Sequence, residues 1–464
     1  MRTYVLFTAG DPAMLIQRTP DVYEKLSLLG SMAGDDVLAP AEQGRGSQTG
    51  RRPYSADKKH PIPGVYRAAM PNGKFINLMR VMFTDFCKMD CAYCPNSIYV
   101  PRKRHAFKVD ELAKLFMELH QRHAVAGLFL SSGIAGDASK TTERLIHVVE
   151  TLRHRYGFRG YVHMKVMPGA AHQYVEAAHR LGTRLSINVE TPTPEMMRRI
   201  GPHKDLVNDI LAPMGWIDQM TRAASAEGRA GAVGQVTQLV VGAADETDQD
   251  IFRRIDQLYT DWNLKRVYYS AFRPVRHIPL EEHPATPPMR EHRLYQLDWL
   301  KRIYQFSNQE LGLAFDQSGF LSLEQDPKTA IAIENLDAFP VDVNAASREQ
   351  LLRVPGVGPT SAQRILDNRR QHKIDTWQDL QSMGVVRTRA WPFLVFPGQR
   401  PPSGKQLRMD LFGEEARLKH RQQVQQAAAN VPYRPAGGPA PCGQAASCTG
   451  CSMYGMPGHP GSER

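Results

Sequence analysis

Short apolar runs alternate with helix-like segments between Lys74 and Phe306, and this alternation constrains the fold more than any other feature of the chain. The predicted strands are Phe75–Phe83, Gly127–Ser132, Gly160–Val166, Arg184–Glu190, Gln235–Gly242 and Lys265–Phe272. The predicted helices are Val109–His123, Thr141–Tyr156, Ala171–Leu181, Lys204–Glu227, Thr247–Trp262 and Arg290–Phe306. Six consecutive units of this kind favour an α/β fold, a partial (β/α)6 TIM-like barrel, over an open doubly wound sheet. In both folds, ligands bind at the carboxyl ends of the strands.

The 464 residues divide into five predicted segments. The N-terminal extension, residues 1–73, contains a helical pattern at Pro20–Ala33 and a basic, Gly-rich stretch at Gln43–His60, which we interpret as a mobile loop. The barrel core follows at 74–310, a connector at 311–340 and a small all-α region at 341–398. Residues 399–464 are predicted to form a charged connector and a Pro/Gly-rich tail. The basic loop is either a solvated linker or a segment that orders on a ligand or nucleic acid.

The overall composition predicts a soluble, cytoplasmic protein. No apolar run approaches the roughly 18 residues of a membrane-spanning helix. The apolar stretch Tyr4–Phe7 is too short for the core of a signal peptide. The formal charge of +11 favours a polyanionic partner such as nucleic acid. Because many basic proteins bind no nucleic acid, charge supports this partner only together with a motif.

The 6 cysteines fall into two triplets, and this clustering indicates metal ligation. Cys87, Cys91 and Cys94 follow the first predicted strand, so their thiolates are expected at the mouth of the barrel. Three thiolates can each hold one iron of a 4Fe-4S cluster and leave the fourth iron open. The alternative is a zinc knuckle, which needs four protein ligands, and the nearest candidate after Cys94 is His105.

The segment Cys87-Lys-Met-Asp-Cys91-Ala-Tyr-Cys94 resembles the CxxxCxxC motif of the radical SAM superfamily, including an aromatic residue at Tyr93. In that superfamily the open iron binds S-adenosyl-L-methionine. Electron transfer from the reduced cluster, supplied by a donor such as flavodoxin or ferredoxin, then cleaves it to a 5′-deoxyadenosyl radical that abstracts a substrate hydrogen. The resemblance implies these two cofactors, and it implies that Tyr93 lies beside the adenine.

Further cofactor contacts are carried over from the same resemblance. Ser131-Ser132-Gly133 stands where the superfamily often has Gly-Gly-Glu binding the methionine amine, and this departure leaves an ordinary turn as the alternative. Asn188 and Glu190 end the fourth predicted strand on one side of it, where the superfamily commonly binds ribose or methionine. Gly242 corresponds to a glycine near the adenine, and the nearby Asp245 is equally suited to be a helix N-cap.

A second motif, Leu351 to Leu366, has the pattern of a helix-hairpin-helix with the turn Gly356-Val357-Gly358. Bare amides at a helix N-terminus bind anions, so this turn is expected to grip a phosphate without reading bases. Arg364, Arg369 and Arg370 would add positive charge. A degenerate second copy is expected at Trp377–Trp391. The alternative is a hairpin that only packs on the barrel or contacts another protein.

Together, Lys25–Leu29, the cysteine motif, Gly127–Gly133, His163–Gly169 and the hairpin resemble one radical SAM family, which is assigned to DNA modification or DNA repair. The resemblance covers roughly Pro20 to Gly398 and implies a DNA-binding protein that pairs with a uracil-DNA-glycosylase-like partner. We therefore expect a radical reaction on DNA, with an RNA-modifying radical SAM enzyme and a non-catalytic, metal-stabilised DNA-binding protein as alternatives. The substrate base and the final bond change stay open.

The tail triplet Cys442, Cys448 and Cys451 departs from that family's pattern. With His459 as a fourth ligand it is a candidate second metal site, for an auxiliary iron–sulfur cluster or zinc. A Pro/Gly-rich tail with cysteines that bind no metal is the alternative.

Overall fold

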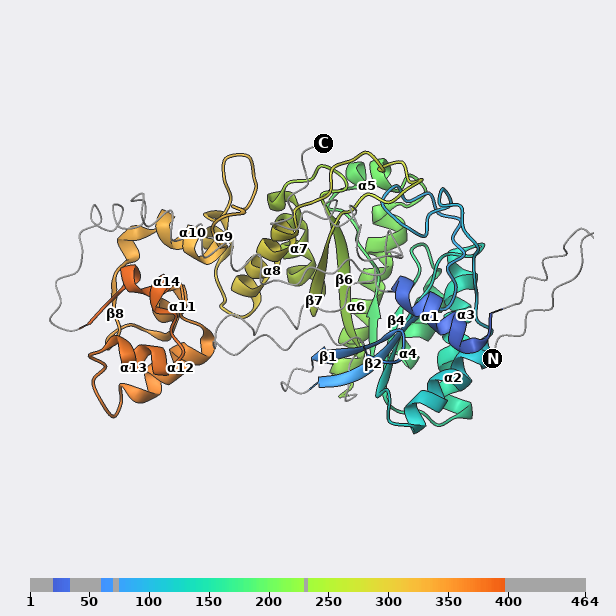
Figure 1. The fold of residues 1–464 in the computed structure, drawn as a ribbon, viewed down its shortest axis with the longest axis horizontal. Helices are drawn as coiled ribbons and strands as arrows, with labels where there is room; N and C mark the ends of the chain where they lie inside the picture. The colour runs from blue at the N-terminus through green and yellow to red at the C-terminus, as the bar shows by residue number, and fades with distance from the viewer. Residues whose placement is uncertain (1–19, 34–59, 70–74, 229–232, 397–464) are drawn as a thin grey trace, which may run out of the picture.

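The computed structural model describes residues 20–33, 60–69, 75–228 and 233–396, and its centre is a seven-stranded sheet with the order β1-β2-β3-β4-β5-β6-β7. The strands are β1 (Val65–Ala69), β2 (Phe75–Met82), β3 (Gly127–Ser131), β4 (Tyr161–Lys165), β5 (Arg184–Ser186), β6 (Gly234–Val241) and β7 (Arg266–Ala271). Strands β2 to β7 are parallel to one another. The sheet curls into a half-barrel (Figure 1). The predicted partial α/β barrel is confirmed.

Strand β1 was missed by the sequence prediction, because its five residues lie inside the stretch assigned to the N-terminal extension. It pairs antiparallel with β2, with Tyr66 opposite Leu78. β5 is shorter than predicted and ends at Ser186, although Glu190 still forms an isolated bridge with Leu239 of β6.

Helices cover the outer face of the sheet (Figure 1). They are α1 (Val22–Met32), α2 (Val109–Gln121), α3 (Ala138–Glu150), α4 (His172–Leu181), α6 (Ala212–Ala226), α7 (Asp248–Trp262) and α8 (Pro288–Arg302). Helix α5 (Pro194–Ile200) lies apart from this layer, next to the cysteine motif, where the Ala92 amide donates to the Ile200 carbonyl at 2.8 Å. A π-helical turn at Thr151–Arg155 extends α3, and another at Leu206–Leu211 precedes α6. Outward strand residues such as Val81, Leu130 and Met164 pack beneath these helices in the main hydrophobic core. By strand alternation, the residues between them face the inside of the curve.

The C-terminal part of the described chain forms a helical unit that lies beyond α8 in Figure 1. Two helices, α9 (Asn308–Gly312) and α10 (Pro327–Glu334), connect α8 to this unit. The unit itself contains α11 (Arg348–Arg353), α12 (Pro359–Asn368), α13 (Trp377–Ser382), α14 (Arg387–Ala390) and a two-stranded ribbon of β8 (Val341–Asp342) and β9 (Leu394–Val395). Among the described residues, no helix has the length and apolar character needed to cross a membrane.

Polar contacts fix the helical unit against α9 and α10. The guanidinium of Arg353 donates to Glu310 at 2.7 Å, and Arg389 pairs with Asp326 at 2.5 Å. The buried ammonium of Lys328 donates to the carbonyl of Val357 at 2.6 Å. Lys328 therefore connects α10 directly to the turn between α11 and α12, where Val357 lies.

Candidate active site

The cysteine loop, residues 83–107, leaves the carboxyl end of β2 and is held in shape by Arg104. One guanidinium nitrogen of Arg104 donates to the carbonyls of Asp85 and Asn96 at 2.7 and 3.0 Å. The other donates to Ser97 and Val100 at 2.8 and 2.9 Å. These four bonds connect both sides of the segment that carries Cys87, Cys91 and Cys94. Sequence reasoning missed Arg104, because nothing in its local pattern marks a side chain that bonds only to backbone.

Gly133, two residues after the end of β3, contacts the same loop. The amide of Gly133 donates to the carbonyl of Thr84 at 2.7 Å. A Cβ atom at Gly133 would lie 2.4 Å from the carbonyl oxygen of Phe86 and 3.1 Å from the Cβ of Cys87. Only glycine therefore allows the loop to approach this closely. The adjacent Ser132 is buried, and its hydroxyl donates to the carbonyl of Gly133 at 2.7 Å.

The three cysteine thiols are free of disulfides and differ in exposure, with Cys91 the most buried. Burial raises the pKa of the Cys91 thiol, and the ammonium of Lys204 opposes that rise. Burial also raises the pKa of the Cys94 thiol, whose sulfur accepts a hydrogen bond from the Asn96 amide at 3.3 Å. Metal binding has to displace protons from these thiols, so a nearby cation favours it. Among the described residues, no three His, Cys, Asp or Glu side chains are arranged around a single metal ion.

Lys204 and Glu190 form a buried ion pair next to Tyr93. The Lys204 nitrogen lies 3.6 Å from a Glu190 oxygen, and it donates to the Tyr93 hydroxyl at 3.1 Å. This contact fixes the Tyr93 ring, which lies 5.6 Å from the same nitrogen. The sequence prediction placed Lys204 at the start of a helix and gave it no role.

Asn188 and Glu190 both lie buried at the carboxyl end of β5, as predicted, but not on a regular strand. Glu190 has a φ of 60°, which non-glycine residues rarely adopt. Its amide and carbonyl still bond to β6, at Gln238 and Val240, with lengths of 3.0 and 2.8 Å. The strand prediction over Arg184–Glu190 is wrong after Ser186, because the Thr237 hydroxyl of β6 takes the place of a backbone partner. It donates to the Ile187 carbonyl at 2.6 Å and accepts from the Val189 amide at 2.9 Å.

Gly242, directly after β6, is enclosed by side chains from the segment before α8 and from α8 itself. Its φ is 84°, and a Cβ atom there would lie 2.0 Å from the hydroxyl of Thr286 and 3.1 Å from a nitrogen of Arg290. Its amide donates to the Glu246 carboxylate, and its carbonyl accepts from His283 at 2.9 Å. Gly242 is therefore a position where two segments meet closely.

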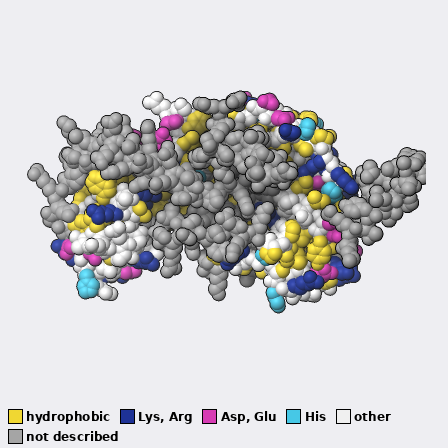
Figure 2. Space-filling model, in the orientation of Figure 1, with side chains coloured by type: hydrophobic (Ala, Val, Ile, Leu, Met, Phe, Trp, Pro, Cys, Tyr) yellow, Lys and Arg dark blue, Asp and Glu magenta, His cyan; other side chains and the backbone are white. Residues whose placement is uncertain are grey.

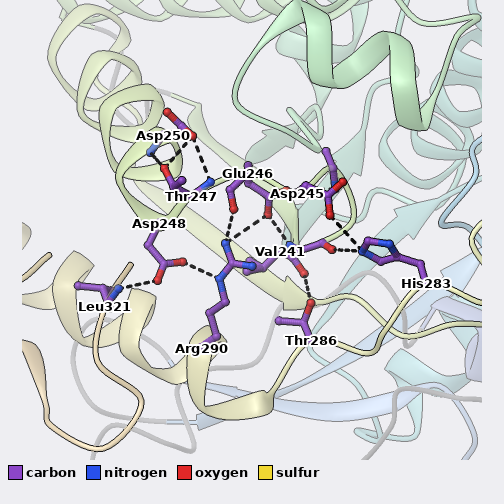
Figure 3. Close-up of polar contacts among 12 residues, drawn as sticks. Val241, Asp245, Glu246, Thr247, Asp248, Asp250, His283, Thr286, Arg290 and Leu321 are labelled. Atoms are coloured by element: carbon purple, nitrogen blue, oxygen red, sulfur yellow. Dashed lines mark hydrogen bonds and ion pairs between the residues drawn. The ribbon is translucent and has the colours of Figure 1, made fainter. Parts of the chain in front are cut away.

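The carboxylates near Gly242 accept hydrogen bonds and form ion pairs that hold the surrounding segments together (Figure 3). Arg290 donates to Asp248 at 2.7 Å, and the other oxygen of Asp248 accepts from the Leu321 amide at 2.9 Å. The N-cap of α7 is Thr247, whose hydroxyl accepts from the backbone amide of Asp250 at 3.0 Å. The suggestion that Asp245 is the N-cap is wrong. Asp245 instead has a φ of 55° and pairs with Arg199 at 2.5 Å.

The helical unit contains both predicted hairpins. In the first, Gly356 has a φ of 81°, and α12 begins at Pro359. In the second, Gly384 has a φ of 92° and separates α13 from α14. Gly358 is the N-cap of α12 and has no side-chain cap.

The residues predicted to contact phosphate are not equivalent. Val357 is buried, its amide donates to the Val354 carbonyl at 3.1 Å, and its carbonyl accepts from Lys328. Val357 is thus packed inside the unit, and its role as a phosphate contact stays a prediction. The guanidinium of Arg369 already uses one of its donors within the unit, because it donates to the Ala346 carbonyl at 2.7 Å. Arg364 and Arg370 are exposed on the surface of the unit. Figure 2 shows Lys and Arg side chains on this part of the molecule, at the left of the view.

Comparison with known protein families identifies both regions. Residues 81–258 match the radical SAM superfamily, and residues 338–386 match a helix-hairpin-helix motif. Residues 81–258 are therefore a radical SAM domain, and the protein is an enzyme. No functionally curated protein matches the chain.

Several solved structures are similar to this chain. HydG, a maturase of the FeFe-hydrogenase, is 12% identical, with a TM-score of 0.37 and coverage of 76% of this chain and 77% of HydG. Methylornithine synthase, PylB, is 11% identical, with a TM-score of 0.36 and coverage of 74% and 80%. Coproporphyrinogen III oxidase, HemN, from Escherichia coli is 13% identical, with a TM-score of 0.30 and coverage of 50% and 58%.

The superfamily implies a 4Fe-4S cluster and S-adenosyl-L-methionine, and the cysteine loop of this chain suits such a cluster. Its donor set is three cysteine thiols on one loop, which leaves one iron of a cubane without a protein ligand. The tail cysteines Cys442, Cys448 and Cys451, with His459, lie outside the described residues, as does the loop Gln43–Lys59.

Proposed function

We propose that this radical SAM enzyme modifies or repairs nucleic acid, with DNA as the substrate. The observation that carries the proposal is the helix-hairpin-helix match at residues 338–386 in a chain whose barrel carries the cysteine motif. Helix-hairpin-helix units bind phosphates through backbone amides and so hold nucleic acid without reading its sequence. The contacts of Lys328, Arg353 and Arg389 support a fixed relation between this unit and α9 and α10.

In this proposal Cys87, Cys91 and Cys94 hold the cluster, and bound S-adenosyl-L-methionine supplies the radical that abstracts a substrate hydrogen. Arg104 and Gly133 keep the cysteine loop in the required shape. Around it, Tyr93, Ser131–Gly133, Asn188 and Glu190 form the surface for the rest of the cofactor. Gly242 supports this surface by letting α8 approach β6. Lys204 orients Tyr93 and neutralises Glu190.

A base inside a duplex cannot reach a group held at the mouth of the barrel, so the proposal requires an extruded base or a single-stranded substrate. The hairpin unit would anchor the flanking backbone while one nucleotide enters the barrel. An electron donor such as flavodoxin or ferredoxin and a uracil-DNA-glycosylase-like partner remain predictions from the family resemblance.

The first test concerns radical generation. Anaerobic reconstitution with iron and sulfide, followed by reduction in the presence of S-adenosyl-L-methionine, should yield 5′-deoxyadenosine. Cys91→Ala should abolish the product, whereas the matched change Cys448→Ala in the tail should preserve it. An intact cluster that gives no 5′-deoxyadenosine would favour the non-catalytic binding protein.

The second test concerns the substrate. Cross-linking followed by sequencing of the bound nucleic acid should recover mainly DNA, and recovery should fall in the Arg364→Gln/Arg370→Gln variant. Mass spectrometry of DNA nucleosides from cells with and without the gene then identifies the altered base without a guess about its chemistry. Predominantly RNA reads would replace DNA by RNA as the substrate.

A further inference from the structure

Three arginines lie on the inner face of the half-barrel, on the side of the sheet away from the helices. Arg80 of β2 and Arg184 of β5 belong to one layer, because Arg80 pairs in register with Phe129, Phe129 with His163, and His163 with Arg184. Arg266 of β7 is opposite Val236 of β6. Strand alternation turns all of these side chains inward, since their neighbours Met79, Leu185 and Val267 belong to the outer core.

Each of these arginines lies over a tyrosine. The guanidinium carbon of Arg80 is 5.1 Å from the ring centre of Tyr66, that of Arg184 is 5.9 Å from Tyr161, and that of Arg266 is 5.2 Å from Tyr268. We call these six residues the arginine–tyrosine cluster. The electrostatic partners of the Tyr66 hydroxyl are Arg80, Arg184, Tyr161 and Tyr268, which shows that the strands bring the pairs together.

Two members of the cluster have unused hydrogen-bonding capacity. Arg184 and Arg266 make no hydrogen bond and no ion pair with any described residue, and the Nε of each is buried. Next to Arg184, the side chain of His163 is 1% exposed; its Nε2 contacts the Ser186 hydroxyl at 2.8 Å, and its Nδ1 has no partner among the described residues. Buried polar atoms without partners are costly, so they point to a group that is bound during function.

Buried arginines elsewhere in the chain behave differently. Arg153 donates to the carbonyls of Leu181, Phe158 and Gly160 at 2.9 to 3.2 Å. Arg293 donates to the carbonyls of Ser322 and Leu323 at 3.0 and 2.9 Å. Unlike these two buried arginines, the half-buried Arg184 and Arg266 donate to no partner among the described residues.

We propose that Arg184 and Arg266, together with Arg80, Tyr66, Tyr161 and Tyr268, bind a phosphate group of the substrate on the inner face of the barrel. The inference rests on the proposed function and specifies where the substrate is held. Guanidinium groups match phosphate oxygens through paired N–H donors, and phenol hydroxyls add further donors. Burial raises the pKa of Tyr161 to about 12, so its hydroxyl remains a donor at neutral pH.

The position of the cluster suits a nucleotide. Arg80 lies two residues before the end of β2 at Met82, or roughly 7 Å along the strand below the start of the cysteine loop. A phosphate held at the arginines would leave the sugar and base directed towards the cysteine loop. The phosphate could belong to a nucleic-acid backbone or to a free mononucleotide, and binding experiments separate these two sources.

The experiment measures ligand-induced thermal stabilisation of the full-length, anaerobically reconstituted enzyme. The probes are an equimolar mixture of deoxynucleoside monophosphates, the same nucleosides without phosphate, and a single-stranded oligonucleotide. The variants are Arg184→Met and Arg266→Met. Arg155→Met, which removes an exposed arginine paired with Asp110 on the outside of the barrel, is the matched control.

For the wild type and the control, we expect phosphate-containing probes to raise the melting temperature and nucleosides to have no effect. In Arg184→Met and Arg266→Met the affinity for these probes should fall about tenfold or more, because a charge-assisted contact is lost. Without ligand, both variants should melt at the same or a higher temperature than the wild type. Lower ligand-free stability with undiminished phosphate binding would overturn the inference and assign the arginines a purely structural role, as would the absence of any phosphate effect in the wild type.

The outcomes separate this inference from the proposed function. Stabilisation by the oligonucleotide that depends on Arg184 but is absent with the monophosphates identifies a nucleic-acid backbone as the source. Stabilisation by the monophosphates alone supports the phosphate site but contradicts nucleic acid as the substrate. Oligonucleotide binding that depends on Arg364 and Arg370 and is insensitive to Arg184 supports nucleic-acid binding and contradicts the phosphate site.

Discussion

The ammonium of Lys204 and the carboxylate of Glu190 lie 3.6 Å apart, and both side chains are buried beside Tyr93. Removing one member of such a pair leaves the other charge buried without a partner. We expect Lys204→Met to lower the free energy of unfolding by about 3 kcal/mol or more. The double variant Lys204→Met/Glu190→Gln should recover part of this loss, because the carboxylate is neutralised as well.

The matched control is Arg180→Met, which breaks the exposed pair of Arg180 with Glu176 on α4. This change should cost less than about 0.5 kcal/mol. Urea unfolding of the metal-free protein provides the measurement. Equal losses for the buried and the exposed pair would contradict the importance assigned to Lys204.

Arg104 should control cluster assembly more than global stability, because its four bonds all lie within the cysteine loop. In Arg104→Met, the iron content after anaerobic reconstitution should fall by more than half while the protein remains folded by circular dichroism. Arg104→Lys should restore only part of the iron, since one ammonium cannot reproduce the planar fork of the guanidinium. Full iron loading in Arg104→Met would show that the loop keeps its shape without this residue.

Gly242 and Gly136 allow backbone strain to be separated from steric overlap. Both have positive φ, 84° and 94°, but only at Gly242 would a Cβ overlap a neighbour, the Thr286 hydroxyl at 2.0 Å. Gly136→Ala should cost about 1 kcal/mol from the backbone alone. Gly242→Ala should cost at least about 2 kcal/mol more, because the overlap forces β6 and the segment before α8 apart. Denaturant unfolding of both variants measures the difference, and similar values would refute the close approach.

Glu291 should make stability depend on pH. Burial raises the pKa of this carboxyl to about 7, and one of its oxygens accepts from the Ala271 amide at 2.9 Å. The folded protein therefore binds this proton more tightly than the unfolded chain, whose carboxyl has an ordinary pKa. The resulting stabilisation is complete below pH about 4 and is lost as the pH rises towards 7.

Glu291→Gln removes this contribution. The difference in unfolding free energy between the wild type and Glu291→Gln should shift in favour of the variant by about 1–2 kcal/mol between pH 4.5 and 7.5. Comparing the two proteins at each pH cancels the titration of other groups, including His292, whose pKa burial lowers to about 4. A difference that does not change with pH would contradict the raised pKa.

The sequence was sufficient to predict those features that a local motif or a periodic pattern marks. The six parallel strands and the two hairpins were predicted because apolar alternation and glycine turns depend on neighbouring residues. The cysteine motif was recognisable for the same reason. In contrast, β1 was missed, because its antiparallel partner β2 defines it and five residues carry too little pattern.

The surroundings of the cysteine loop could not be predicted, because they depend on distant contacts. Lys204 reaches Tyr93 across a separation of 111 residues, and Arg104 bonds to carbonyls that have no side-chain signature. The inner arginines occupy single positions on different strands, and they meet only when the sheet curls. Val357 was predicted as a phosphate contact, but its amide donates to the Val354 carbonyl and its carbonyl accepts from Lys328, which lies outside the hairpin.

Arg364 and Arg370 should contribute to nucleic-acid affinity through charge alone, since both are exposed and Arg370 has only a 3.6 Å contact with Asp367. Changing either to Gln should weaken binding of unrelated sequences to a similar extent and reduce the slope of log K against log salt by about 1. Fluorescence anisotropy at several salt concentrations provides the measurement, with Arg155→Gln as the control of equal charge. Arg369→Gln should also lower stability, because it loses bonds to Val343 and Ala346. Unchanged slopes for Arg364→Gln and Arg370→Gln would remove this face of the hairpin unit from the nucleic-acid interface.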